Sequence, residues 1–292
     1  MYCCRAYFKS SYGLKTTQRL FTETTEIEDF LSVQRQPLTS RTLPPMHIMM
    51  RLFSLFFTIL CLPLLASGQH IEKSVKPFTR VVASPRVNVV LSKGAKESVR
   101  LVYSNLTEDL INIIVTGKTL RIYLDNARKY EKQSAHSDRG DRKSLYEEAR
   151  VTAYVTYKEL DMLEIRGSQQ LYCEDPIESD AFTLRAYGEN DIHISFLKTP
   201  FFKAKLYGEN DLQIRKGRTL EQKYVSYGEN RVDTKGMRSD YIITSIFGEG
   251  SLKLNSAEEV RIDAFGEPEI HVDGGAQINR RLVIGKANIQ QN

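Results

Sequence analysis

Apolar and polar residues alternate with a period of two over much of the chain, which is the pattern of β-strands. Residues from Thr183 to His193 with odd numbers are mostly polar, and the same alternation continues from 202 to 214. No helical i, i+3, i+4 stripe of apolar residues competes with it. The apolar or small set around Gly188 consists of Phe182, Leu184, Ala186, Gly188, Asn190, Ile192, Ile194 and Phe196.

A short motif centred on glycine recurs at a nearly constant interval. Weaker copies centre on Gly167 and Gly285, and the intervals between the seven glycines are 21, 20, 20, 20, 18 and 19 residues. Such regularity indicates one structural unit that is repeated. The clear copies are Tyr187-Gly-Glu-Asn-Asp-Ile192, Tyr207-Gly-Glu-Asn-Asp-Leu212, Tyr227-Gly-Glu-Asn-Arg-Val232, Phe247-Gly-Glu-Gly-Ser-Leu252 and Phe265-Gly-Glu-Pro-Glu-Ile270.

Period and alternation together predict an all-β fold, a single-stranded parallel β-helix (solenoid) of ~20-residue coils. A propeller blade needs about twice this period, and the leucine and asparagine spacing of leucine-rich repeats is absent. Stacked coils place equivalent residues about 4.8 Å apart. We therefore expect Asn190, Asn210 and Asn230 to form an inward ladder of amides, and each glycine to mark a tight bend.

The remaining residues of 69–292 are expected to extend the same domain. Strand patterns occur within 87–124 and resume at 151–155. Between them, residues 126–149 carry six basic and five acidic residues with few apolar ones. This composition predicts an exposed polar insert, either a loop or a short polar helix.

An apolar stretch near the start predicts export. Arg51 precedes 14 mostly apolar residues, 52–65, and Ala66-Ser67-Gly68 supplies the small residues that a signal peptidase requires. We interpret residues 49–68 as a signal peptide, since a membrane anchor needs about 20 apolar residues and Pro63 interrupts this stretch. After cleavage no transmembrane helix is expected, and the address is the periplasm, the outer surface or the extracellular space. Because a signal peptide normally begins a chain, residues 1–48 are interpreted as an over-extended start or a disordered leader.

Charge and cysteine usage narrow the function classes. The 292 residues carry a net charge of +5, and residues 1–69 hold 7 of the 41 basic and 4 of the 36 acidic residues. The remainder, with 34 basic and 32 acidic residues, gives no reason to expect a nucleic-acid partner. Only Cys173 remains after the predicted cleavage, so no intramolecular disulfide is expected and a buried core thiol is predicted.

Residues that flank each glycine predict two outward columns, which are the candidate ligand site. Five stacked carboxylates repel one another by roughly 1 kcal/mol per adjacent pair even in water, so nearby cations (Lys203, Lys205, Arg185, Arg231), a bound cation or raised pKa values should offset them. The columns form a ledge for sugar rings or a cationic partner, or else an aromatic stack that only stabilises the coils. The aromatic column is Tyr187, Tyr207, Tyr227, Phe247 and Phe265, and the acidic column is Glu189, Glu209, Glu229, Glu249 and Glu267.

Catalytic and metal signatures are absent from the sequence. It contains no nucleophile elbow, phosphate loop, zinc spacing or dinucleotide fingerprint, and the nine-residue calcium repeat does not match; hard-cation binding by the glutamates stays open. Asp191, Asp211 and His193 could serve a carbohydrate-active β-helix enzyme, a polysaccharide lyase or hydrolase. However, the two aspartates occupy equivalent repeat positions, so repetition explains them without chemistry. We therefore predict a non-catalytic protein without cofactor or metal.

Three further segments resemble the auto-transporter adhesin family with a head GIN domain, found in bacterial envelope proteins. The first is Phe78-x-x-Val81 followed by Val87-x-Val89, the second is Gly117-Lys-Thr-Leu-Arg-Ile122, and the third runs from Val151 to Gly167 into the repeats. The resemblance covers about residues 78–289 and implies a β-helix-like fold, export, and binding or adhesion to an envelope or extracellular ligand, a glycan or a protein. This sequence has Gly-Glu-Asn where the family usually has turns rich in Gly-Ser-Gly.

Overall fold

A computed structural model describes residues 69–127, 146 and 149–292, which lie within one unit that spans Leu65–Asn292. The predicted leader (1–48) and signal peptide (49–68) lie outside the described residues, as does most of the predicted insert at 126–149. Of the insert's described residues, Tyr146 and Ala149 are buried, and the Tyr146 hydroxyl donates a hydrogen bond to the Asp125 carbonyl. Within the described ranges, no helix has the length and hydropathy of a membrane span.

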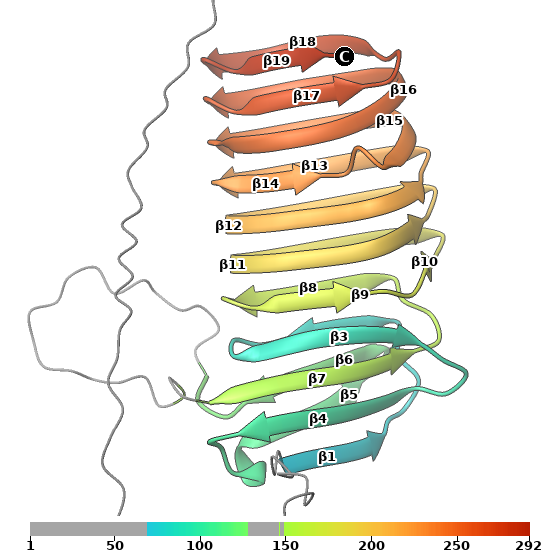
Figure 1. Cartoon of the computed structure of the whole chain (residues 1–292), viewed down its shortest axis with the longest axis vertical. Helices are drawn as coiled ribbons and strands as arrows, with labels where there is room; N and C mark the ends of the chain where they lie inside the picture. Colours follow the sequence, from blue (N-terminus) through green and yellow to red (C-terminus); the bar gives the residue numbers. More distant parts are fainter. Residues whose placement is uncertain (1–68, 128–145, 147–148) are drawn as a thin grey trace, which may run out of the picture. The chain divides into compact units, whose positions relative to one another are not determined.

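The described chain forms strands arranged in two facing layers (Figure 1). One short 3-10 helix, η1 (Glu108–Leu110), precedes β5. The back layer contains β5 (Ile111–Thr116), β6 (Thr119–Leu124), β2 (Arg80–Ala83), β8 (Met162–Gly167), the first halves of β11 (Ala181–Lys198) and β12 (Phe201–Arg218), β13 (Glu221–Gly228), β15 (Met237–Gly248), the second half of β16 (Gly250–Gly266) and β18 (Gln277–Gly285).

In the front layer the chain runs back toward the edge at which the back-layer strands begin. At that edge β10 (Ile177–Glu178) pairs with the end of β11. The front-layer strands are β1 (Gln69–Ser74), β4 (Ser98–Ser104), β7 (Arg150–Tyr157), β3 (Val87–Lys93), β9 (Gln170–Cys173), the second halves of β11 and β12, β14 (Asn230–Asp233), the first half of β16, β17 (Glu269–Asp273) and β19 (Asn288–Gln291).

The repeats form the predicted parallel solenoid. From β8 onward every strand pair is parallel, and Gly188 pairs with both Gly167 and Gly208 in the neighbouring coils. The register advances by 20 residues from β11 to β12 and again from β12 to β13, so equivalent residues of successive repeats lie directly above one another. This confirms the β-helix of ~20-residue coils.

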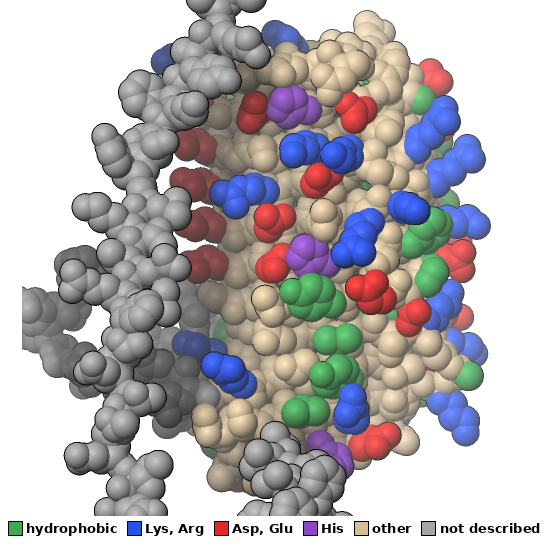
Figure 2. Space-filling model, viewed as in Figure 1, with side chains coloured by type: hydrophobic (Ala, Val, Ile, Leu, Met, Phe, Trp, Pro, Cys, Tyr) green, Lys and Arg blue, Asp and Glu red, His purple; other side chains and the backbone are tan. Residues whose placement is uncertain are grey.

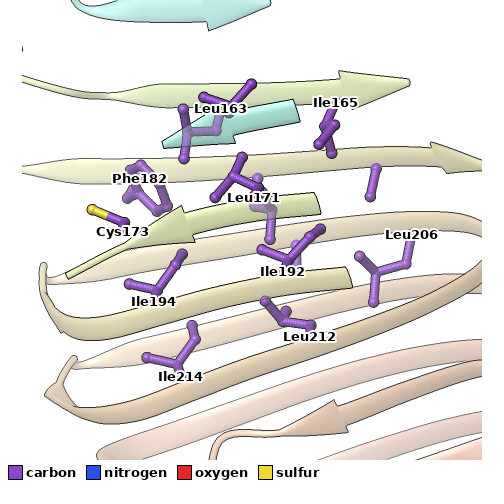
Figure 3. Packing of buried hydrophobic residues seen from close by; sticks show 14 of the residues in the cluster. Leu163, Ile165, Leu171, Cys173, Phe182, Ile192, Ile194, Leu206, Leu212 and Ile214 are labelled. Atoms are coloured by element: carbon purple, nitrogen blue, oxygen red, sulfur yellow. The ribbon is translucent and has the colours of Figure 1, made fainter. Parts of the chain in front are cut away.

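Side chains of the apolar parity fill the space between the two layers. Figure 3 shows Leu163, Ile165 and Phe182 of the back layer facing Ile192 and Ile194 of the front layer, and all five are buried. Each coil alone has an apolar face without a cover, so the stack creates one continuous core. Because the strands alternate, every second side chain points outward, and only these side chains are available to bind a partner.

The predicted asparagine ladder lies inside this core. The Asn190 side-chain amide donates to the Asn210 carbonyl oxygen at 2.7 Å, and Asn210 donates to Asn230 at 2.8 Å. Asn230 closes the series by donating to the Ser226 hydroxyl at 2.9 Å. Because buried amides need partners, the ladder explains why asparagine recurs at this position.

Cys173 is the buried core thiol that the sequence predicts. Its sulfur lies 3.6 Å from the Tyr157 hydroxyl. Burial is the main cause that raises the pKa of the Cys173 thiol to about 11, and burial likewise raises the pKa of Tyr157. A thiol of this kind is almost entirely protonated at neutral pH and hence a poor nucleophile.

The strands before β8 depart from the regular parallel coil that the sequence predicts for the whole domain. β4 pairs antiparallel with both β1 and β7, and β5 pairs antiparallel with β6. The link from β5 to β6 is Gly117-Lys118, with Gly117 at φ +58°, and such a short connection joins antiparallel neighbours only. The N-terminal strands thus close the stack in a different way from the coils.

Candidate functional site

The chain bends sharply from the back layer to the front layer at each repeated glycine, along the left edge of Figure 1. Gly208 has a φ of +108°, and a Cβ atom at this position would lie 2.4 Å from the carbonyl oxygen of Gly188. The equivalent distance from Gly228 to Gly208 is also 2.4 Å. Only glycine accommodates both the left-handed backbone and this approach. We call this edge, with the two columns beside it, the bend edge.

The aromatic column stacks face to face, as its alignment in successive repeats predicts. Ring centroids are 5.1 Å apart from Tyr187 to Tyr207 and 5.2 Å from Tyr207 to Tyr227, followed by 4.5 Å to Phe247 and 4.8 Å to Phe265. The planes differ by only 4–7°. Each ring therefore covers the faces of its neighbours, and the solvent meets ring edges.

The two ends of the aromatic column have different neighbours. The Arg166 guanidinium lies 5.7 Å from the centroid of the Tyr187 ring, and Ile284 pairs in register with Phe265 at the other end. Burial is the main cause that raises the pKa of the Tyr187 hydroxyl, and the Glu164 carboxylate adds to it. The three inner rings of the column therefore present no open face, and Arg166 lies over the outer face of Tyr187.

The acidic column occupies the position directly after each glycine, and all five glutamates are exposed. Figure 2 shows acidic side chains stacked along the left edge of the coils. For the last four members, Glu209, Glu229, Glu249 and Glu267, the described residues include no cation within ion-pair distance. In the next coil the equivalent position is occupied by Lys286, which ends the acidic column.

The cations near the column form no ion pair with Glu209, Glu229, Glu249 or Glu267 among the described residues. The sequence suggested that Arg185, Lys203, Lys205 and Arg231 offset the glutamates, but Arg185 lies 3.5 Å from Glu164 instead. Burial, followed by repulsion from Lys205, lowers the pKa of Lys203, which places it among other cations on the outer back layer. Arg231 lines the same groove as Glu209 and Glu229, but it does not come within ion-pair distance of either glutamate.

An open groove of about 600 Å³ runs beside the acidic column. Its second wall comes from the third residue after Gly208, Gly228, Gly248 and Gly266. Of these four residues, the sequence drew attention only to Asp211 and Arg231. Repeat alignment also contains the signal for Ser251 and Glu269, which were missed. The lining residues are Glu189, Asn190, Glu209, Asn210, Asp211, Glu229, Arg231, Glu249, Gly250, Ser251, Glu267 and Glu269.

The residues considered for catalysis lie on the front layer. Asp191 contacts the Nε2 atom of His193 at 2.7 Å, and the Nδ1 atom of His193 lies 3.1 Å from Gln213. A similar contact of 3.2 Å joins His271 to Glu269 four coils away. Asp211 pairs in register with Asp191. Histidine next to a carboxylate two residues before it is therefore a local feature of these strands that occurs twice.

No group of three or more His, Cys, Asp or Glu side chains in the described part of the chain is arranged to hold a metal ion. Neighbouring glutamates of the acidic column belong to different coils and follow one another along the bend edge (Figure 2). The column therefore presents charge along a line rather than a coordination cage.

A family model described as "Putative auto-transporter adhesin, head GIN domain" matches residues 77–276. The chain belongs to this family. The head GIN match includes every residue of the aromatic and acidic columns. It confirms the resemblance found in the sequence, and a search of curated proteins finds no match.

Solved structures share the fold of this head GIN domain. A "putative adhesin" from Bacteroides fragilis NCTC 9343 has 16% identity and a TM-score of 0.59, and the match covers 78% of this chain and 98% of that chain. Another from Parabacteroides merdae ATCC 43184 has 12% identity and a TM-score of 0.53, with coverage of 78% and 97%. A "putative lipid binding protein" from Parabacteroides distasonis ATCC 8503 has 13% identity and a TM-score of 0.53, with coverage of 78% and 98%. At these identities the likeness concerns the fold.

Proposed function

We propose that this head GIN domain is an exported, non-catalytic binding protein of the bacterial envelope, and that the acidic column of the bend edge holds a cationic partner. The proposal is supported by comparing the residue types that recur in the repeats, most of which recur for structural reasons. Glycine recurs because the bend requires it, asparagine because of the buried ladder, and the aromatic residues stack on one another. Glutamate also recurs, yet Glu209, Glu229, Glu249 and Glu267 have no ion-pair partner among the described residues, and aligned carboxylates repel one another.

The stacking favours a cationic partner over a sugar. A saccharide packs on an aromatic face, and the faces of the column are occupied by neighbouring rings. Exposed carboxylates that repeat about every 4.8 Å along an open groove suit the side chains of an extended segment rich in lysine and arginine, or a linear polyamine. The segment would lie along the solenoid axis.

A catalytic role has less support. The adhesin family favours binding, and the contact between Asp191 and His193 has a counterpart at Glu269 and His271. An acid and base pair in a polysaccharide-cleaving enzyme is one assembled centre. A contact that repeats along a regular face is a poor candidate for such a centre.

Export itself has a direct test. The apolar stretch at 52–65 and the small residues 66–68 predict cleavage near Gly68. N-terminal sequencing of the exported protein should begin near Gln69. A peptide from residues 16–35 in a digest of the native protein would contradict the interpretation of the leader as an over-extended start.

The binding proposal is tested with an oligolysine peptide and isothermal titration. We expect Glu209→Gln/Glu229→Gln/Glu249→Gln to weaken binding roughly tenfold, since each exposed ion pair contributes about 0.2–1 kcal/mol. A matched control, Glu72→Gln/Glu108→Gln/Asp109→Asn, removes three exposed charges of β1 and η1 that lie outside the acidic column, and it should bind like the wild type. Equal losses in both triple variants would overturn the proposal.

A glycan array tests the alternative, which is that the bend edge binds a saccharide. Tyr207→Ala/Tyr227→Ala should leave any saccharide signal unchanged if the rings serve as a stack. A saccharide that the wild type binds and this double variant loses would assign the bend edge to a glycan and overturn the cationic partner.

A further inference from the structure

The coils have a second edge, opposite the bend edge, where the chain passes from the front layer to the next coil. Lys198, Arg218 and Arg238 lie in register there in three successive coils. Parallel strands are about 4.8 Å apart, so their backbones form a row of closely spaced cationic positions. Arg215, Lys216 and Lys235 are exposed close to this row. Figure 2 shows basic and hydrophobic side chains, with some acidic ones between them, along the right edge of the coils.

Few carboxylates pair with these cations. Lys198 lies 3.9 Å from Glu178, and both side chains are exposed. For Arg215, Lys216, Arg218, Lys235 and Arg238, the structure places no carboxylate of a described residue within ion-pair distance. Like charges in a row repel one another, so an anionic partner would relieve the repulsion.

Large apolar side chains emerge among the same turns. Phe201 is 52% exposed, Leu220 is 43% exposed and Tyr241 is 42% exposed, and each follows shortly after one of the three aligned cations. Inward positions of the same coils are filled by buried residues, so these three are not required for the core. We define the basic edge as the six cations together with Phe201, Leu220 and Tyr241.

We propose that the basic edge binds the surface of an anionic lipid bilayer. Lysine and arginine are attracted to anionic headgroups, and aromatic and aliphatic side chains between them enter the boundary with the acyl chains. A soluble polyanion would use the cations alone and leave the three apolar side chains in water. Backbone groups of these coils already pair with the coils above and below, which disfavours strand addition by a second copy of the chain.

The opposite location of the two charged edges gives this surface a direction. When the basic edge lies on an anionic bilayer, the acidic column points away from it. The bends in the middle of β11 and β12 lie at one edge of the two layers, and the turns between these strands lie at the opposite edge (Figure 1). Repulsion between the glutamates and the lipid supports the same orientation. The inference does not depend on what the acidic column binds.

Co-sedimentation with vesicles tests this surface. The exported protein should bind vesicles that contain phosphatidylglycerol and phosphatidylcholine, and should not bind phosphatidylcholine alone. Lys198→Gln/Arg218→Gln/Arg238→Gln should weaken binding about 100-fold, from the contribution of each cation near an anionic surface. Phe201→Ser/Leu220→Ser/Tyr241→Ser should abolish the binding that remains at high salt, where the electrostatic part is screened.

A charge-matched control separates the surface from net charge. Arg100→Gln/Arg150→Gln/Lys253→Gln removes three exposed cations of the front-layer strands β4, β7 and β16 and should bind like the wild type. All variants have the same residues outside the substituted positions. Any membrane affinity of other segments therefore contributes equally to each variant and does not affect the differences between them. Equal losses in both cation variants, equal binding to both vesicle types, or binding of polyphosphate without binding of vesicles would each overturn the proposal. The proposal would also be overturned if only aggregated protein bound vesicles, that is, if the monomeric fraction from gel filtration did not bind them.

Discussion

The two edges at which the chain reverses direction are built by different means. At the bend edge, glycine allows a left-handed backbone, and each glycine nearly touches the carbonyl of the one before it. At the opposite edge, Thr219 is buried, and its hydroxyl lies 3.0 Å from the Pro200 carbonyl and 2.9 Å from that of Glu221. Backbone geometry therefore dictates the residue at the bend, whereas a small buried hydroxyl suffices at the turn.

Surface residues differ in the same way. The bend edge repeats glutamate in five coils, while the turn edge varies its cations and apolar residues from coil to coil. A residue type that repeats at a buried or strained position is explained by the fold. A residue type that repeats at an exposed position, although it reduces stability, indicates a function. The following variants, in order of decreasing effect, test this division.

The largest effect is expected at the bend itself. Gly208→Ala places a Cβ atom 2.4 Å from a carbonyl oxygen at φ +108° and should reduce the free energy of unfolding by roughly 3 kcal/mol or more. Urea denaturation followed by circular dichroism measures it. Gly275→Ala is the control, because a Cβ atom there meets no atom within 4 Å. Similar midpoints for the two variants would show that the bend does not require glycine.

The second effect compares a buried amide at the bend with a buried hydroxyl at the turn. Asn210→Leu leaves the Asn190 amide donor and the Asn230 acceptor with fewer partners, so we expect a loss of about 2–3 kcal/mol. Thr219→Val keeps the side-chain shape and removes one hydroxyl donor, which should cost about 1 kcal/mol. Chemical denaturation gives both values, and the reverse order would contradict the greater constraint at the bend.

Sequence alone predicts most of the bend edge. The alternation around Phe182 and Leu184 shows which side chains point into the core, and the glycine intervals give the length of each coil. Together they predict that Asn190 belongs to an inward ladder and Tyr187 to an outward column. The sequence does not reveal the buried hydroxyls of Thr199, Thr219 and Ser239, since these residues are also common in exposed turns.

Other features depend on long-range pairing. Strand patterns before residue 124 look like those of the repeats, yet β4 and β5 pair antiparallel. Local alternation is the same for either direction, so periodicity cannot distinguish them. Likewise the sequence aligns Tyr207 with Tyr227 but does not show that the rings lie parallel and cover one another.

A third variant compares two tyrosines of equal exposure, one at each edge. Tyr227 is 41% exposed and stacks between Tyr207 and Phe247, whereas Tyr241 is 42% exposed and stacks on no ring of the described residues. Tyr227→Leu should reduce the free energy of unfolding by about 1–2 kcal/mol through the loss of two aromatic pairs, and Tyr241→Leu should have little effect. Thermal and urea unfolding measure both. Equal effects would remove stacking as the reason for the repeated aromatic residue.

The smallest effect has the opposite sign and bears most directly on the acidic column. Glu229→Gln removes repulsion from Glu209 and Glu249, so stability should increase, by at most about 1 kcal/mol at low ionic strength. Salt screens the repulsion between exposed charges, and the gain should disappear at high salt. Glu108→Gln, on the exposed helix η1, is the control and should not gain. If Glu229→Gln instead destabilised the protein, glutamate would have a structural role at the bend, and its repetition would no longer indicate a binding surface.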